Sequence, residues 1–191
     1  MTTNANEAKR QTGAAEYGVS PENGTVRLER LLPGPIERVW AYLTESEKRG
    51  KWLAEGAMEP RPGSSFELRF YHSRLSSRQA PVPERYKDGC QEGVPSEHKL
   101  IRWEPPRLLV ITWGSGADGP SEVTFELSPR GNDVLLVLTH RRLTDRKATI
   151  GVAAGWHTHL AVLIERLNGR EPEAFWTTFE RVESEYEKRI A

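Results

Sequence analysis

The stretch GWHTHLAVLIERLNG, residues 155–169, decides the fold. Its apolar residues recur at helical spacing, and Asn168-Gly169 is a typical helix C-terminus. The apolar residues form one stripe, made of Trp156, Leu160, Leu163 and Leu167. His157 and His159 flank this stripe, rotated from Trp156 by about 100° and about 60° in opposite senses. Histidines that share a metal from one helix are three or four residues apart. We therefore predict a core helix with no metal site, and with both histidines at the margin of its buried face.

Upstream of this helix the sequence alternates apolar and polar residues in short runs, which is typical of strands. The connections between the runs are brief, so consecutive strands must be antiparallel neighbours, because a parallel crossover needs a dozen or more residues. A weak run at 56–59 brings the predicted number to about seven strands. The predicted strands are 25–32, 56–59, 65–71, 98–104, 107–114, 121–128 and 132–140.

Two short helices are predicted between the first two strands. Pro35 suits the first turn of a helix, and the apolar residues after it fall on one face. Thr44 and Glu47 have the spacing of a capping box, which predicts a second helix ending near Gly50. The face of the first helix consists of Ile36, Val39, Trp40 and Leu43.

The remaining segments lie outside this pattern. Residues 1–24 are polar and aperiodic, so we predict a disordered leader before a domain at 25–170, with a further helix in 171–191. The 72–97 segment is a long irregular loop, of a kind that is usually functional or disordered. In an up-and-down sheet this loop lies at the same end as the exit from the last strand, so we predict a flap over that end.

Composition excludes several classes of protein. The 27 basic and 27 acidic residues balance, which argues against a nucleic-acid binder. The single cysteine, Cys90, excludes an intrachain disulfide and a cysteine zinc site, and we predict an unreactive thiol there. No run approaches the ~20 apolar residues that span a bilayer, and no signal peptide is evident. We predict a cytoplasmic protein without membrane insertion.

Recognised catalytic motifs are missing: there is no Gly-rich phosphate loop, no G-x-S-x-G and no H-E-x-x-H. His140 shares a strand face with Leu136, and is either a satisfied core residue or the polar anchor of a pocket. The six tryptophans indicate an aromatic interior, which packs a core or lines an apolar ligand cavity. We predict no cofactor.

Five segments in order carry a family resemblance. They are RLLPGPIERVWAYLTESEKRGKWL, PGSSFELRF, WEPPRLLVITWG, SEVTFELSPRGNDVLLVLTHRRL and GWHTHLAVLIERLNG. Together they resemble the START-like (SRPBCC) superfamily, in the branch of the activator of heat-shock protein 90 ATPase homologue. The resemblance implies an α+β helix-grip fold, in which a curved antiparallel sheet wraps around a long C-terminal helix. It also implies binding of apolar or amphipathic molecules, lipid transfer, polyketide cyclisation or chaperone assistance, with no shared catalytic residues.

The favoured function is binding of a lipid-like or aromatic small molecule in a cavity between sheet and long helix, without catalysis. One alternative is a cyclase or hydrolase with His140 as general base, and another is a module that binds a chaperone or other partner. A monomer and a homodimer both stay open. The candidate ligand-binding residues are Trp40, Phe66, Leu68, Phe70, Trp113, Val123, Phe125, Leu136, His140, Trp156, His157, Leu160 and Leu163.

Overall fold

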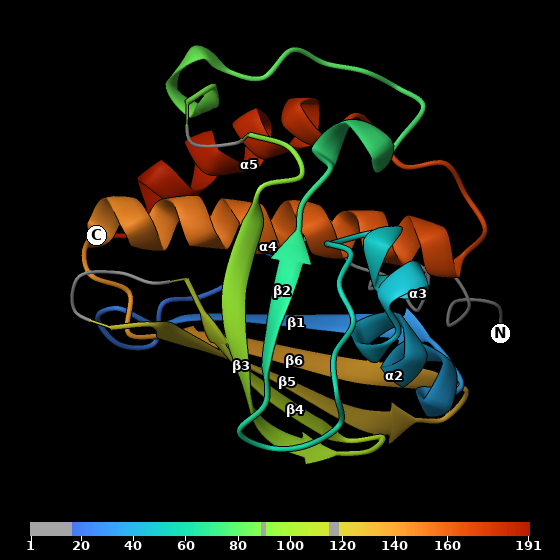
Figure 1. Cartoon of the computed structure of the whole chain (residues 1–191). Coiled ribbons are helices and arrows are strands. Elements are labelled where there is room, and N and C mark those ends of the chain that lie inside the picture. Colours follow the sequence, from blue (N-terminus) through green and yellow to red (C-terminus); the bar gives the residue numbers. More distant parts are fainter. Residues whose placement is uncertain (1–16, 89–90, 115–118) are drawn as a thin grey trace, which may run out of the picture.

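The computed structural model describes residues 17–88, 91–114 and 119–191. Within these residues six strands form one antiparallel sheet, in the order β1–β6–β5–β4–β3–β2, which curves around a long helix (Figure 1). The strands are β1 (Val26–Pro33), β2 (Ser65–Arg69), β3 (Pro95–Glu104), β4 (Leu108–Trp113), β5 (Ser121–Arg130) and β6 (Asp133–Arg141). The helices are α2 (Ile36–Thr44), α3 (Ser46–Gly50), α4 (Arg146–Leu167) and α5 (Phe175–Arg189), with 3₁₀ turns η1 (His72–Arg74) and η2 (Glu84–Tyr86).

The core lies between the inner face of the sheet and α4. Strand alternation sends Val123, Phe125 and Leu127 of β5 inward, while Glu126 between them is exposed. Helix α4 begins at Arg146, where the Asp145 carboxylate accepts a hydrogen bond of 2.7 Å from the Ala148 N–H, as a helix N-cap does. The predicted α+β helix-grip fold is confirmed, and its centre is filled by packed side chains.

The predicted strand at 56–59 is wrong, and the sheet has six strands where we predicted about seven. Only an isolated bridge between Glu55 and Arg69 remains of that pairing. The backbone groups of Gly56 are engaged locally instead: its N–H donates to Ser46 Oγ, and its carbonyl accepts from the buried Arg49 guanidinium. Groups bonded in this way are not available to a strand ladder.

Residues 17–24, which we predicted to be part of a disordered leader, contact the domain. Val19 forms an antiparallel bridge with Arg27, and the Tyr17 ring contacts His157 and Tyr186 at centroid distances of 5.0 and 5.3 Å. An aromatic side chain and one strand bridge fix residues 17–24 on the domain, although the segment has no periodicity. The rest of the predicted leader, residues 1–16, lies outside the described residues, as does Cys90.

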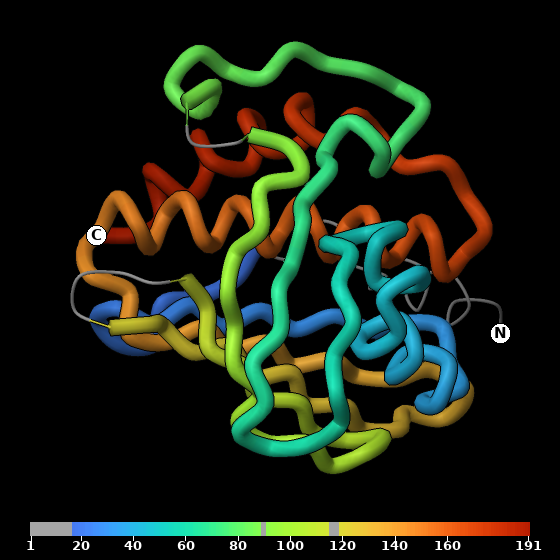
Figure 2. The backbone as a smooth tube through the Cα atoms, viewed as in Figure 1, coloured from blue at the N-terminus to red at the C-terminus, as the bar shows by residue number. Residues whose placement is uncertain are grey.

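The 72–94 loop does not lie over the end of the sheet as predicted. It is shorter, because β3 begins at Pro95, and residues 72–88 run along α5 on the side away from the sheet (Figure 2). Tyr86 of this loop stacks on Trp176 of α5 with centroids 5.8 Å apart, and Tyr86 and Arg85 both bind the Glu183 carboxylate. The aromatic face of α5 therefore holds the loop, and only its two ends reach the sheet.

None of the helices in the described part of the chain is long and apolar enough to cross a membrane.

Candidate functional site

Two adjoining cavities lie at the end of the sheet where β2 and β4 end and β3 begins. The larger has a volume of about 390 Å³ and the smaller about 190 Å³, and Trp113 and His159 line both. We call the two together the cleft. The larger cavity is also lined by Phe70, His72, Gln91, Val94, Pro95, Ser96, His98 and Gly114. The smaller is also lined by Gly151, Val152, Gly155 and Trp156 of α4.

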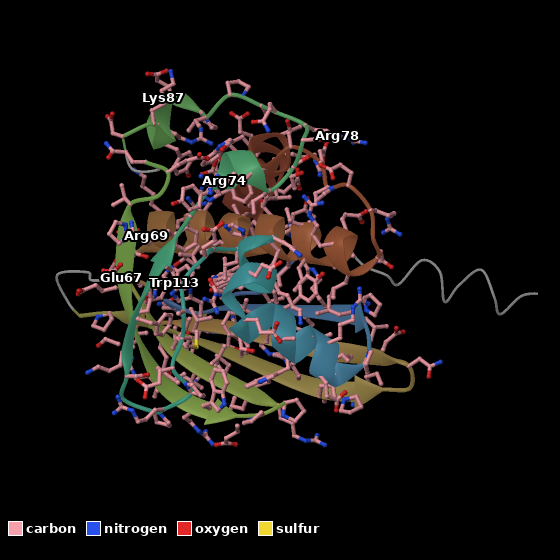
Figure 3. The ribbon with its side chains drawn as sticks, turned by 45° about the vertical axis from the view of Figure 1, so that its right-hand side comes forward. Glu67, Arg69, Arg74, Arg78, Lys87 and Trp113 are labelled. Carbon is pink, nitrogen blue, oxygen red and sulfur yellow. The ribbon has the colours of Figure 1, made fainter. Side chains whose placement is uncertain are left out.

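The lining of the cleft carries no Asp, Glu, Lys or Arg among the described residues. Figure 3 shows Trp113 below α4, and Arg78 and Lys87 on the outer loop; Glu67 and Arg69 of β2 lie nearer to Trp113 in this view, but neither lines a cavity. An uncharged lining of aromatic and imidazole rings is suited to an apolar ligand with few polar groups.

Contacting aromatic rings form one wall of the cleft. Trp113 meets Phe70 edge to face at 5.8 Å between ring centroids, and it meets Trp156 at 4.8 Å. Trp156 in turn contacts Phe125 in the core at 5.6 Å. Such pairs add to the stability that burial alone supplies, so this wall is preformed.

His140 lies behind this wall. The Trp156 indole N–H, which can only donate, gives a hydrogen bond of 2.9 Å to His140 Nδ1. The other nitrogen, Nε2, must therefore carry the proton of the neutral ring, and it lies 2.7 Å from Ser121 Oγ. Burial lowers the pKa of His140 to about 4, which keeps the ring neutral at pH 7. His140 is fully buried and lines neither cavity.

His159 and His72 do face the cleft. His159 Nδ1 lies 2.7 Å from the Trp52 carbonyl oxygen, an acceptor, so Nδ1 carries the proton and Nε2 keeps its lone pair. Burial, and to a lesser extent the neighbouring His72, lower the pKa of His159 to about 3, against an opposing effect of the hydrogen bond to Trp52. Burial lowers the pKa of His72 to about 4, against an opposing effect of Glu92. Both rings are therefore neutral at pH 7, and the described residues that line the cleft carry no formal charge.

The third histidine of the cleft, His98, pairs with Ser96 two residues earlier on β3. Its Nε2 lies 2.7 Å from Ser96 Oγ, and its Nδ1 lies 2.9 Å from the Thr112 carbonyl oxygen on β4. Burial, and to a lesser extent the charge of Arg49, lower the pKa of His98. The ring stacks on Phe66 at 5.6 Å and meets Trp113 at 5.0 Å, which fixes its orientation.

The structure brings together only part of the predicted ligand-binding set. Phe70, Trp113 and Trp156 line the cleft. Most of the others are core residues that line neither cavity: Trp40, Phe66, Leu68, Val123, Phe125, Leu136, His140, Leu160 and Leu163. His157 lies on another side of α4, where its Nδ1 is 3.1 Å from the Tyr186 hydroxyl.

Sequence reasoning missed His72 and Ser96 because they lay in the predicted irregular loop, and it missed His98 because nothing in the sequence marks the first residue of the predicted strand 98–104 as a cavity residue. It placed His159 at the margin of the helix but did not select it. Gly151 and Gly155 carried a usable signal, since two glycines one turn apart in a helix are costly without a reason.

A curved antiparallel sheet closed on one long helix, with a cleft at one end of the grip, defines a helix-grip domain of the START-like (SRPBCC) class. More narrowly, the chain belongs to the family of activator of Hsp90 ATPase homolog 1-like proteins, whose family model matches residues 33–168. The resemblance stated from the sequence is confirmed.

Similar solved structures agree with this fold. A Bordetella parapertussis protein solved by solution NMR is 46% identical, with a TM-score of 0.77 and 94% of each chain covered. CalU16 from Micromonospora echinospora is 20% identical, with a TM-score of 0.62 and 86% of each chain covered. DynU16, a protein in the dynemicin biosynthetic locus, is 16% identical at a TM-score of 0.62, covering 81% of this chain and 51% of its own. No curated protein matches the chain.

Proposed function

We propose that this domain binds an uncharged aromatic small molecule, carrying a hydroxyl or N–H group, in the cleft between the sheet and α4. The observation that carries the proposal is the lining: aromatic side chains and neutral histidines, with no formally charged group among the described residues. This proposal narrows the predicted function, which included fatty acids and other lipids.

The absence of charge from this lining disfavours a carboxylate ligand. A carboxylate that leaves water without a cationic partner loses its solvation, and this penalty is large in a partly closed cavity. The histidines do not supply the cation, because burial lowers the pKa of His72 to about 4 and that of His159 to about 3. A neutral ring system meets no such penalty and gains contact with Trp113 and Phe70.

The hydrogen bond between His159 and Trp52 supports a ligand that carries a hydrogen-bond donor. Because the Trp52 carbonyl accepts a hydrogen bond from the Nδ1–H of His159, the Nε2 atom keeps a lone pair on a ring that lines both cavities. A ligand hydroxyl or N–H can donate to it, and a ligand acceptor cannot. Polar groups in such sites set orientation, while apolar contact supplies most of the affinity.

Isothermal titration calorimetry with three matched naphthalenes at pH 7.5 tests the proposal. We expect 2-naphthol to bind, naphthalene to bind more weakly and 2-naphthoate not to bind. Trp113→Leu should weaken 2-naphthol binding about tenfold or more, or about 1.4 kcal/mol. Trp103→Leu is the matched control, since Trp103 is also a half-buried strand tryptophan but packs on Trp40, away from the cleft. Preference for 2-naphthoate, or no binding of any of the three, would contradict the proposal.

A further inference from the structure

Two serine–histidine pairs lie near the cleft. They have the same distance between Ser Oγ and His Nε2, but the histidine donates the hydrogen bond in one pair and accepts it in the other. Ser96 Oγ is 2.7 Å from His98 Nε2, and Ser121 Oγ is 2.7 Å from His140 Nε2. The partner of the second ring nitrogen decides which atom carries the proton, and that partner differs between the two pairs. This difference separates a reactive pair from a structural one.

In the Ser121–His140 pair the histidine is the donor. Trp156 donates a hydrogen bond to His140 Nδ1, so the ring proton is on Nε2, and Ser121 Oγ accepts the hydrogen bond from Nε2–H. The Ser121 hydroxyl donates its own hydrogen bond to the Trp113 carbonyl oxygen, 2.8 Å away. His140 has no free lone pair to take a proton from this serine, and the pair is structural.

In the Ser96–His98 pair the histidine is the acceptor. Its Nδ1 faces the Thr112 carbonyl oxygen at 2.9 Å, and a carbonyl can only accept, so Nδ1 carries the proton. The lone pair on Nε2 then accepts the Ser96 hydroxyl, whose other acceptor, the Leu68 carbonyl, is more distant at 3.4 Å. A hydroxyl, a base and a group that orients the base are the parts of an activated nucleophile.

The pair is also accessible. Ser96 and His98 both line the larger cavity, whereas Ser121 and His140 line neither. Gln91 borders the same cavity, and its carboxamide N–H can donate to a carbonyl oxygen that becomes negatively charged. Trp113 and Phe70 provide the aromatic surface for a ring next to the reacting bond.

We propose that Ser96 and His98 hydrolyse uncharged aryl esters in the larger cavity. Ser96 Oγ attacks the ester carbonyl carbon while His98 Nε2 takes the hydroxyl proton. The carbon–oxygen bond to the aryl group breaks, and the phenol leaves with the proton from Nε2. Water then attacks the acyl-serine, gives a proton to Nε2 and releases the carboxylic acid, while Ser96 regains its proton. The proposal rests on the proposed function only for seating the aromatic ring.

The experiment uses p-nitrophenyl acetate, follows p-nitrophenol release, and maps acetyl groups by peptide mass spectrometry. We expect release above the uncatalysed rate and one acetyl group on Ser96. Ser96→Ala and His98→Gln should each lower the rate of p-nitrophenol release about 100-fold. Ser121→Ala is the matched control, because it removes a hydroxyl at the same distance from an imidazole, and it should keep the rate.

Further measurements keep the test decisive. Ser96→Cys should still become acetylated. This result tests the assignment of the nucleophile even if the His98→Gln variant does not fold. 2-Naphthol binding is measured separately on the wild-type protein, so binding without hydrolysis would overturn the catalytic proposal and leave the proposed function standing. A wild-type rate equal to that of Ser96→Ala, or acetyl groups on lysines alone, would overturn the proposal.

Discussion

Two glycines of α4 offer a direct test of the cleft. Gly151 and Gly155 lie one turn apart and line the smaller cavity, and a Cβ added at either would meet no atom within 4 Å. Glycine in a helix interior costs about 1 kcal/mol relative to alanine. Because no contact opposes the added methyl group, Gly155→Ala should stabilise the protein by about 1 kcal/mol, or about 2–4 °C in Tm for a chain of this size.

A larger side chain at position 155 should weaken ligand binding. The added methyl group enters the cavity of about 190 Å³, and Gly155→Leu fills much of it. We expect Gly155→Leu to weaken 2-naphthol binding at least about tenfold, or about 1.4 kcal/mol. Differential scanning calorimetry measures the stability, and isothermal titration calorimetry measures the affinity.

The control is Ala161→Gly on the same helix, which lies away from the cleft. It should lose about 1 kcal/mol of stability and keep wild-type affinity. If Gly155→Leu bound 2-naphthol as tightly as the wild type, the smaller cavity would have no part in binding. If Gly155→Ala were destabilised, the space above the helix would be filled in solution, and the reasoning would fail.

Two further predictions concern stability. Burial lowers the pKa of His140 to about 4 from an ordinary value of 6.5, so the native state takes up its proton less readily than the unfolded chain. The free energy of unfolding therefore has its full value above pH 6.5 and falls by about 3 kcal/mol toward pH 4, because the unfolded chain binds the proton first. In urea unfolding, the stability of His140→Gln should depend correspondingly less on pH over this range. Leu160 is fully buried on α4, so Leu160→Ala should lower the free energy of unfolding by about 2–5 kcal/mol. A decrease well below 1 kcal/mol in urea unfolding would place this side chain outside the core.

The sequence by itself determined the fold class and most of its elements. Alternation of apolar and polar residues predicted the strands around Phe125 and Leu136, and the stripe through Trp156 and Leu160 predicted the gripped helix. These signals are reliable because burial imposes a period on residues close in the chain. The prediction of a strand at 56–59 was wrong because Arg49 and Ser46 form hydrogen bonds with the backbone of Gly56.

Only the tertiary structure decided the site. The cleft combines His72 from a loop, Ser96 and His98 from β3, Trp113 from β4 and His159 from α4. No local pattern links these residues, because a cavity is where segments distant in sequence leave space between them. Their chemistry is non-local as well: the carbonyls of Trp52 and Thr112 set the protonated nitrogens of His159 and His98, and Trp156 sets that of His140. The sequence supplied the imidazoles, and the fold decided which of them can accept a proton.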